Sequence, residues 1–141
     1  MTFGLKRSDL QSLSITKLDD AHILFQNKRY SSAYYLAGYC IELGLKACIS
    51  RLMLADVIPD KAFVNGIYQH SLRPLVNLAG LASVLKAKED GDANFAANWA
   101  VVSEWNPETR YNTKDVHSAQ LLLNAISDPK TGVLTWIKEH W

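Results

Sequence analysis

The sequence predicts an all-α protein, and three observations lead to that prediction. The first is the stretch from Arg29 to Leu54, RYSSAYYLAGYCIELGLKACISRLML, in which apolar residues recur at three- and four-residue steps. The second is the placement of proline, glycine and capping residues between other runs of the same period. The third is that no stretch alternates apolar and polar residues as a half-buried strand does. We therefore expect an up-down helical bundle with additional short helices.

The first helix is expected to begin at Ser8 or Ser14 and to end at Gln26. Ser14 is a good N-cap, and Ser8 followed by an acidic residue is equally good. The polar turn that follows, residues 27–29, is short. Helices joined by so few residues pack antiparallel, so the first two helices should lie side by side.

The second helix is expected to run from this turn to about Ala55, with Ser31 or Ser32 as its N-cap and with Pro59 beyond its end. Its apolar stripe is wide, and few charges interrupt it. One neighbour cannot bury such a stripe, so this helix is predicted to be the central rod of the bundle.

The middle of the chain is less regular. In order, the patterns predict a short turn or helix over 63–68, a short helix over 72–80 that Gly80 ends, a helical piece over 81–88, an exposed break at 89–92, and a helix over 94–105. Asn106-Pro107 then breaks the chain, because proline disfavours a helical conformation in the residue before it. Thr113 is predicted to cap a helix that runs through Ile126, and Asp128-Pro129 to start the last helix.

Length and composition suit one soluble domain over residues 1–141. The formal net charge is +1, which argues against a generally basic, nucleic-acid-coating surface but leaves room for a local basic cleft. Cys40 and Cys48 are too far apart along one helix for a disulfide and are expected to be buried, reduced thiols. The N-terminus has no signal-peptide pattern, and no apolar run reaches membrane-spanning length. We therefore expect a cytoplasmic protein with no membrane partner.

The segment SEWNPETRYNTKDVH, residues 103–117, contains the best candidates for chemistry, Arg110 and His117. RNA cleavage is the chemistry implied by the family resemblance described below, and cleavage of RNA by its own 2′-hydroxyl needs a proton acceptor, a proton donor and a cation beside the phosphate. Histidine transfers protons near neutral pH, and arginine offers a fixed fork of donors to phosphate oxygens. Neither role requires a metal. The alternative is that Arg110 is a structural pin that bonds a carboxylate such as Glu42 and helix-end carbonyls.

Two further groups accompany this pair. Glu42 and Lys46 are four residues apart and therefore share one helix face, where they form either a simple surface ion pair or part of a polar network between helices. Tyr39 and Tyr111 are predicted to form an aromatic rim; bases can stack on such rings, although packing and dimer contact are the other interpretations. The remaining histidines are weaker candidates, and His70 is best interpreted as a capping or packing residue. No metal-ligand motif and no cofactor-binding motif occurs in the sequence.

The stretch LDDAHILFQNKRYSSAYYLAGYCIELGLKACI resembles the opening helix pair of the HEPN family, and the resemblance extends from about Leu18 to Trp136. Arg110 and His117 match the R-x4-6-H pattern of its nucleases, with Tyr111 where a polar residue is usual, and Glu42 and Lys46 match an E-x3-K pattern. The context from Trp105 to Tyr111 also resembles a W-x-P-x-x-R-Y signature of one branch of the family. The resemblance implies a metal-independent endoribonuclease of toxin or defence type. The alternative is a non-catalytic module that binds nucleotide, RNA or a protein.

The same resemblance implies partners. Family members form homodimers in which both R-x4-6-H motifs surround one cleft, and many are paired with a nucleotidyltransferase-type antitoxin. We therefore expect a homodimer, RNA as the substrate or ligand, and an antitoxin of that type.

Overall fold

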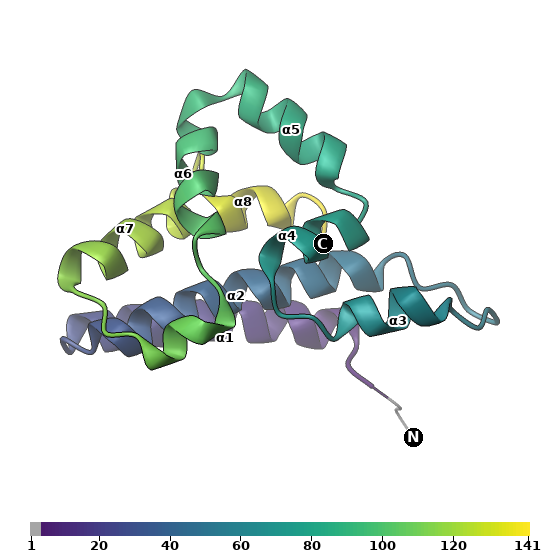
Figure 1. Ribbon diagram of the computed structural model, residues 1–141, viewed down its shortest axis with the longest axis horizontal. Helices are drawn as coiled ribbons and strands as arrows, with labels where there is room; N and C mark the ends of the chain where they lie inside the picture. The colour runs from purple at the N-terminus through teal and green to yellow at the C-terminus, as the bar shows by residue number, and fades with distance from the viewer. Residues whose placement is uncertain (1–3) are drawn as a thin grey trace.

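The computed structural model describes residues 4–141, and within this range the chain is all-α, as predicted, with no strand. Its elements, in order, are α1 (Arg7–Gln26), α2 (Tyr30–Ser50), α3 (Lys61–Ile67), α4 (Leu72–Leu78), α5 (Ala82–Gly91), α6 (Ala93–Ser103), the 3₁₀ helix η1 (Pro107–Tyr111), α7 (Val116–Ser127) and α8 (Val133–Lys138). Figure 1 shows α1 and α2 side by side along the long axis, with α7 and α8 following one another above them.

Helix α2 is the central rod that its apolar stripe predicts. It contacts α1, α4, α7, α8 and η1, and most of its residues between Ala33 and Ile49 are buried. Cys40 and Cys48 are among them, and both are free thiols, as expected. Burial raises the pKa of Cys40 to about 12 and that of Cys48 to about 11. Both cysteines therefore act as small apolar core residues.

Two glycines allow other elements to approach α2 closely. A Cβ atom on Gly38 would overlap the indole ring of Trp105, which follows α6. A Cβ atom on Gly44 would lie 3.1 Å from Ile137 of α8 and 3.5 Å from the Ser14 hydroxyl of α1. The segment before η1 and the last helix are therefore seated directly on the α2 backbone.

The serines predicted as caps are used differently. Ser14 lies within α1, fully buried, and its hydroxyl donates to the Cys40 carbonyl of α2 at 2.8 Å. Arg29 is the N-cap of α2 and makes no side-chain cap bond, whereas the Ser31 hydroxyl accepts from the Lys114 amide at 2.8 Å. Both predictions of serine caps on α2 were wrong, because one hydroxyl bonds a distant segment and neither caps the helix.

Two predicted boundaries in the first part of the chain also differ. Helix α2 ends at Ser50 rather than near Ala55, and the apolar residues beyond it are exposed: Leu52, Met53, Leu54, Val57 and Ile58. Helix α5 continues to Gly91, so the predicted break at 89–92 is reduced to Asp92, which caps α6 by accepting from the Phe95 amide.

The last two helices begin later than predicted. Asp115, not Thr113, caps α7 by accepting from the Ser118 amide at 2.8 Å. Asp128 accepts from the amides of Lys130 and Thr131 in a tight turn, so α8 begins only at Val133. In both places an aspartate satisfies nearby amides, and this fixes where the helix begins.

Candidate functional site

Arg110 is presented to solvent by the short helix η1. Pro107 starts this helix, and the Asn106 side chain accepts from the Glu108 amide at 2.9 Å. Thr109 is buried, with only 3% of its surface exposed, whereas the next two residues, Arg110 and Tyr111, are exposed. The buried threonine fixes η1 to the bundle and leaves the guanidinium outside.

The Arg110 guanidinium is held by aromatic rings. It lies over the Tyr111 ring, 4.8 Å from the ring centroid. The adjacent Tyr111 side chain, and to a smaller extent Tyr35 and the charge of Glu108, raise the pKa of Arg110 above its ordinary value. Among residues 4–141 no carboxylate forms an ion pair with it, and Glu42 bonds other residues. The structural role predicted for Arg110, a pin on Glu42, is therefore wrong for this chain.

An open groove of about 420 Å³ lies beside Arg110, and we call it the Arg110 groove; its lining residues are Leu24, Ser31, Ser32, Tyr35, Leu36 and Arg110. It combines a guanidinium, the Ser32 hydroxyl and an aromatic ring, whereas the Ser31 hydroxyl is bonded to the Lys114 backbone. Guanidinium and hydroxyl groups donate to phosphate oxygens, and a tyrosine ring can stack on a base. The groove therefore has the donor set that a phosphate-bearing strand requires.

The aromatic floor of this groove is fixed by packing. Tyr35 stacks on Tyr39 with centroids 6.3 Å apart and planes 10° apart, and it also contacts Trp105 at 6.0 Å. Trp105 is buried and lies against Gly38. Of the predicted rim, Tyr111 is 73% exposed, and Tyr39 is half-buried beside Tyr35. Of the two rim tyrosines, Tyr111 is thus on the surface and Tyr39 packs beside the ring that lines the groove.

His117 lies in the first turn of α7 and is exposed. It is not among the residues that line the Arg110 groove, and within the described part of the chain its side chain makes no hydrogen bond. Asp115 is two residues before this histidine. Hydrogen bonds from Ser118 lower the pKa of Asp115 and so favour its charged carboxylate form. One chain therefore does not bring Arg110 and His117 into one groove.

Glu42 and Lys46 form the ion pair that their spacing predicts, with Lys46 Nζ 3.2 Å from Glu42 Oε2. The same oxygen lies 3.1 Å from Nδ1 of His70, which precedes α4. Glu42 is buried, so these three residues form the interhelical polar network that was one of two interpretations of the pair. The sequence interpretation of His70 as a capping residue is wrong: Ser71 is the N-cap of α4, and His70 bonds Glu42.

His70 is thus a candidate site residue that the sequence reasoning missed. A signal for it existed, because a single acidic residue within an apolar helix needs partners from elsewhere in the chain. The segment that supplies this partner, His70-Ser71-Leu72, can be seen in the sequence, but the sequence does not show that it lies next to α2.

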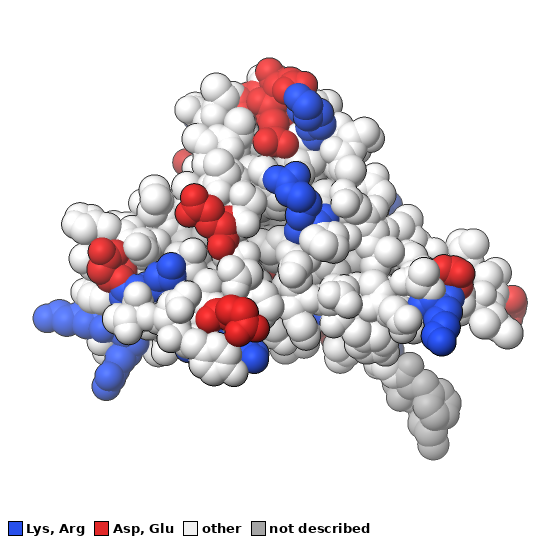
Figure 2. Space-filling model, in the orientation of Figure 1, with Lys and Arg blue, Asp and Glu red and all other residues white. Residues whose placement is uncertain are grey.

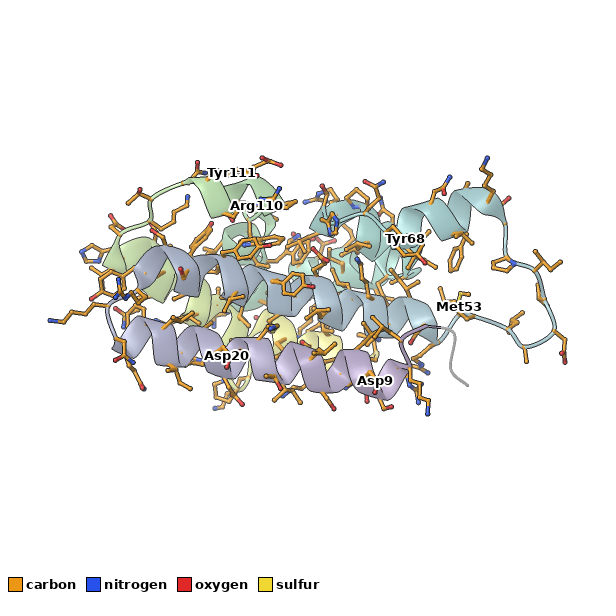
Figure 3. The ribbon with its side chains drawn as sticks, turned by 90° about the horizontal axis from the view of Figure 1, so that it is seen from below. Asp9, Asp20, Met53, Tyr68, Arg110 and Tyr111 are labelled. Atoms are coloured by element: carbon orange, nitrogen blue, oxygen red, sulfur yellow. The ribbon has the colours of Figure 1, made fainter. Side chains whose placement is uncertain are left out.

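Figure 3 shows Arg110, Tyr111 and Tyr68 on one side of α2, and Asp9 and Asp20 of α1 on the other side. Tyr68 is two residues before His70. Arg110 and the segment that leads to His70 therefore lie on the same side of α2.

No family model, curated protein or solved structure matches the chain. Within residues 4–141, no helix has the length and hydropathy that a bilayer crossing requires. The same residues hold no group of three histidine, cysteine or acidic side chains arranged to bind a metal ion.

Proposed function

We propose that this protein is a HEPN-like RNA-binding protein that cleaves RNA without a metal ion. The observation that carries the proposal is Arg110: an exposed guanidinium, paired with no carboxylate of the described residues, at the edge of a groove lined by hydroxyl groups and a packed tyrosine. A surface arginine without such surroundings would have no particular ligand. Here the surrounding groups complement a phosphate and the base next to it.

The charge near this groove supports an anionic ligand. Lys28 and Arg29 in the turn before α2 are exposed, and Lys114 lies close by, with its ammonium 4.7 Å from the centroid of Tyr34. Figure 2 shows positive side chains projecting at this end of the molecule, with acidic side chains beside them. The protein is nearly neutral overall, and three cations lie near the groove.

In the proposed reaction Arg110 binds the phosphate and stabilises the charge that develops on it, while His117 acts as the general acid/base. The 2′-oxygen attacks phosphorus, the bond to the 5′-oxygen breaks, and a 2′,3′-cyclic phosphate is left on one product. Because His117 lies outside the Arg110 groove of its own chain, the proposal includes a homodimer in which a second copy brings its motif to the same cleft.

The test is incubation of labelled single-stranded RNA with the pure protein in EDTA. The variants are Arg110→Ala and His117→Ala, and the control is Arg7→Ala, an exposed arginine at the start of α1. We expect metal-free cleavage by the wild type and by the control, and loss of a hundredfold or more in both site variants. Light scattering during chromatography measures whether the wild type is a dimer.

One observation favours a second function, that of a binding module without catalysis. The His117 ring has no hydrogen-bond partner among the described residues, so nothing in one chain orients it for proton transfer. RNA binding that depends on Arg110, with no cleavage by the wild type, would establish this second function. The antitoxin partner and the cytoplasmic location implied above stay predictions.

A further inference from the structure

The Glu42–Lys46–His70 cluster has the geometry of an oriented proton acceptor. The Glu42 side chain is 3% exposed, and its Oε2 atom faces both Lys46 Nζ at 3.2 Å and His70 Nδ1 at 3.1 Å. In contrast, the His70 side chain is 59% exposed. One ring nitrogen is thus fixed to a buried carboxylate while much of the ring is in contact with solvent.

This contact determines which nitrogen of neutral His70 carries the proton. A carboxylate oxygen can only accept, so Nδ1 must be the donor of the bond to Glu42. A neutral imidazole has one donor and one acceptor nitrogen, and Nε2 is therefore the acceptor. Nδ1 is engaged with the buried carboxylate, so Nε2, on the other side of the ring, is the nitrogen available to a ligand. A carboxylate that fixes the tautomer and orientation of a histidine in this way is a common basis of general-base catalysis.

We propose that His70 is a catalytic residue of this protein and takes the proton from the attacking 2′-hydroxyl of RNA, with Glu42 as its positioning residue; this inference rests on the proposed function. The proton moves from the 2′-hydroxyl to Nε2 as the bond from the 2′-oxygen to phosphorus forms. The bond from phosphorus to the 5′-oxygen breaks, and that oxygen takes a proton from the His117 imidazolium, so that His117 is the general acid of the proposed reaction and His70 is its general base. Exchange with solvent water then moves the proton from the His70 imidazolium back to His117, which restores both rings.

An RNA strand bound at Arg110 can reach His70 along α2. Tyr35 lines the Arg110 groove, and Glu42 bonds His70. These two residues of α2 are seven positions apart, so they lie on nearly one helix face, roughly 10 Å apart along the axis. The Arg110 and His70 of one chain therefore contact different nucleotides of the strand, so the guanidinium beside the phosphate that is cleaved at His70 comes from the second copy in the proposed homodimer. Tyr39 lies between them, stacked on Tyr35, and the charge of Glu42 together with burial raises its pKa.

A cation is available at the His70 end as well. Lys46 is 15% exposed and lines a second groove of about 420 Å³ together with Ile49, Met53 and Tyr68. Its ammonium group can therefore neutralise Glu42 and still face a phosphate that enters from this side. The ring that accepts the proton and the cation that attracts the phosphate are held on the same carboxylate.

The test compares His70→Ala with His117→Ala in the EDTA cleavage assay, using RNA and the same RNA with a single 2′-deoxy position. His22→Ala is the control, because this histidine lies on α1 and bonds Ser127 instead. We expect His70→Ala to slow cleavage by about 10²- to 10⁴-fold with little change in RNA affinity. Added imidazole should restore part of the activity, and the 2′-deoxy position should not be cleaved.

A second readout needs no activity. In nitrogen-15 spectra of the imidazole, the wild type should show neutral His70 with the proton on Nδ1. Glu42→Gln should move a large part of the population to the Nε2-protonated form and slow cleavage, because an amide can donate to Nδ1. A wild-type His70 protonated on Nε2 would overturn the inference, even if the alanine variant failed to fold.

The outcomes separate the two proposals. Cleavage by His70→Ala at the wild-type rate, with loss in Arg110→Ala and His117→Ala, overturns the role of His70 and leaves the proposed function standing. Absence of cleavage by the wild type overturns both. Loss in His70→Ala without rescue by imidazole, together with a lowered melting temperature, assigns His70 a structural role and also overturns the inference.

Discussion

The two sides of α2 differ in how they are held. At its buried positions, Gly44 on the side away from Tyr35 and Gly38 next to Tyr35, the backbone admits the last helix and an indole ring, and the Ser14 hydroxyl donates to the Cys40 carbonyl. On its open side, Tyr35 lines a groove and stacks on Tyr39, and Arg110 lines the same groove without an ion-pair partner among the described residues. The buried positions leave no room for a larger side chain, whereas the open side leaves the Arg110 guanidinium available to a ligand.

This difference indicates how stability and function are divided along one helix. Contacts on the buried side are made with backbone atoms and cannot relax by a rotation of side chains, so changes there should lower the free energy of unfolding. Groups on the open side contact mainly rings and solvent, so changes there should affect ligand binding and leave stability nearly unaltered. Glu42 lies at the border, because it is buried yet holds the exposed His70.

The largest effect is expected from Gly38→Ala. The added methyl group would overlap the Trp105 ring, and because that ring also packs on Tyr35, the floor of the Arg110 groove must shift with it. Overpacking of this kind should lower the free energy of unfolding by about 3 kcal/mol. Urea unfolding measures the change, and RNA affinity should fall in the same variant.

The matched control is Gly91→Ala. Gly91 is the last residue of α5, and a Cβ atom there meets nothing within 4 Å. Alanine suits a helix better than glycine, so this variant should be as stable as the wild type or more stable by up to about 1 kcal/mol. Equal stability of the two alanine variants would show that the buried side of α2 is less tightly packed than its geometry indicates.

A smaller effect is expected from alkaline pH, through the buried thiols. Burial raises the pKa of Cys40 to about 12 and of Cys48 to about 11, whereas unfolded cysteine ionises at about 8.5. Above that value the unfolded state loses protons that the folded state keeps, so the contribution of these thiols is complete below about pH 8.5 and is lost as pH rises toward 11 to 12. Between pH 7 and pH 9.5 the free energy of unfolding should fall by roughly 3 kcal/mol, about half from each thiol.

Chemical denaturation at several pH values tests this, with the double variant Cys40→Ala, Cys48→Ala as the comparison. The double variant is less stable at pH 7 because it has lost buried atoms, but its stability should change little up to pH 9.5. An equal pH dependence in both proteins would mean that the thiols do not distinguish the folded from the unfolded state.

The same division explains what the sequence could predict. Period and composition are properties of a single helix, so the all-α class, the central position of α2 and the buried cysteines could all be predicted from them. The end of α2 could not, because Leu52 to Ile58 continue an apolar pattern although Ile58 is 96% exposed. Periodicity cannot distinguish an apolar residue that packs from one that faces solvent.

Contacts between distant segments were the other source of error. Ser31 has the composition of a cap, but its hydroxyl bonds Lys114, 83 residues later. His70 is 28 residues from the carboxylate that orients it, and no spacing rule connects them. Arg110 and His117 were related by a pattern eight residues long, yet they lie on different elements and only Arg110 lines the groove. Local patterns find candidate residues, and only tertiary structure shows which of them meet.

The smallest effect on stability is expected from Arg110→Ala, although its effect on binding should be clear. The guanidinium is exposed and contacts mainly the Tyr111 ring, so the midpoint of thermal unfolding should stay within about 2 °C of the wild type. If Arg110 neutralises one phosphate of a single strand, its loss should lower the slope of the logarithm of RNA affinity against the logarithm of salt concentration by about 0.7. Fluorescence anisotropy at several salt concentrations measures this slope. Arg7→Ala should leave this slope unchanged. An equal change in both variants would mean that Arg110 acts on RNA only as one more surface charge, and that the open side of α2 has no particular role in RNA binding.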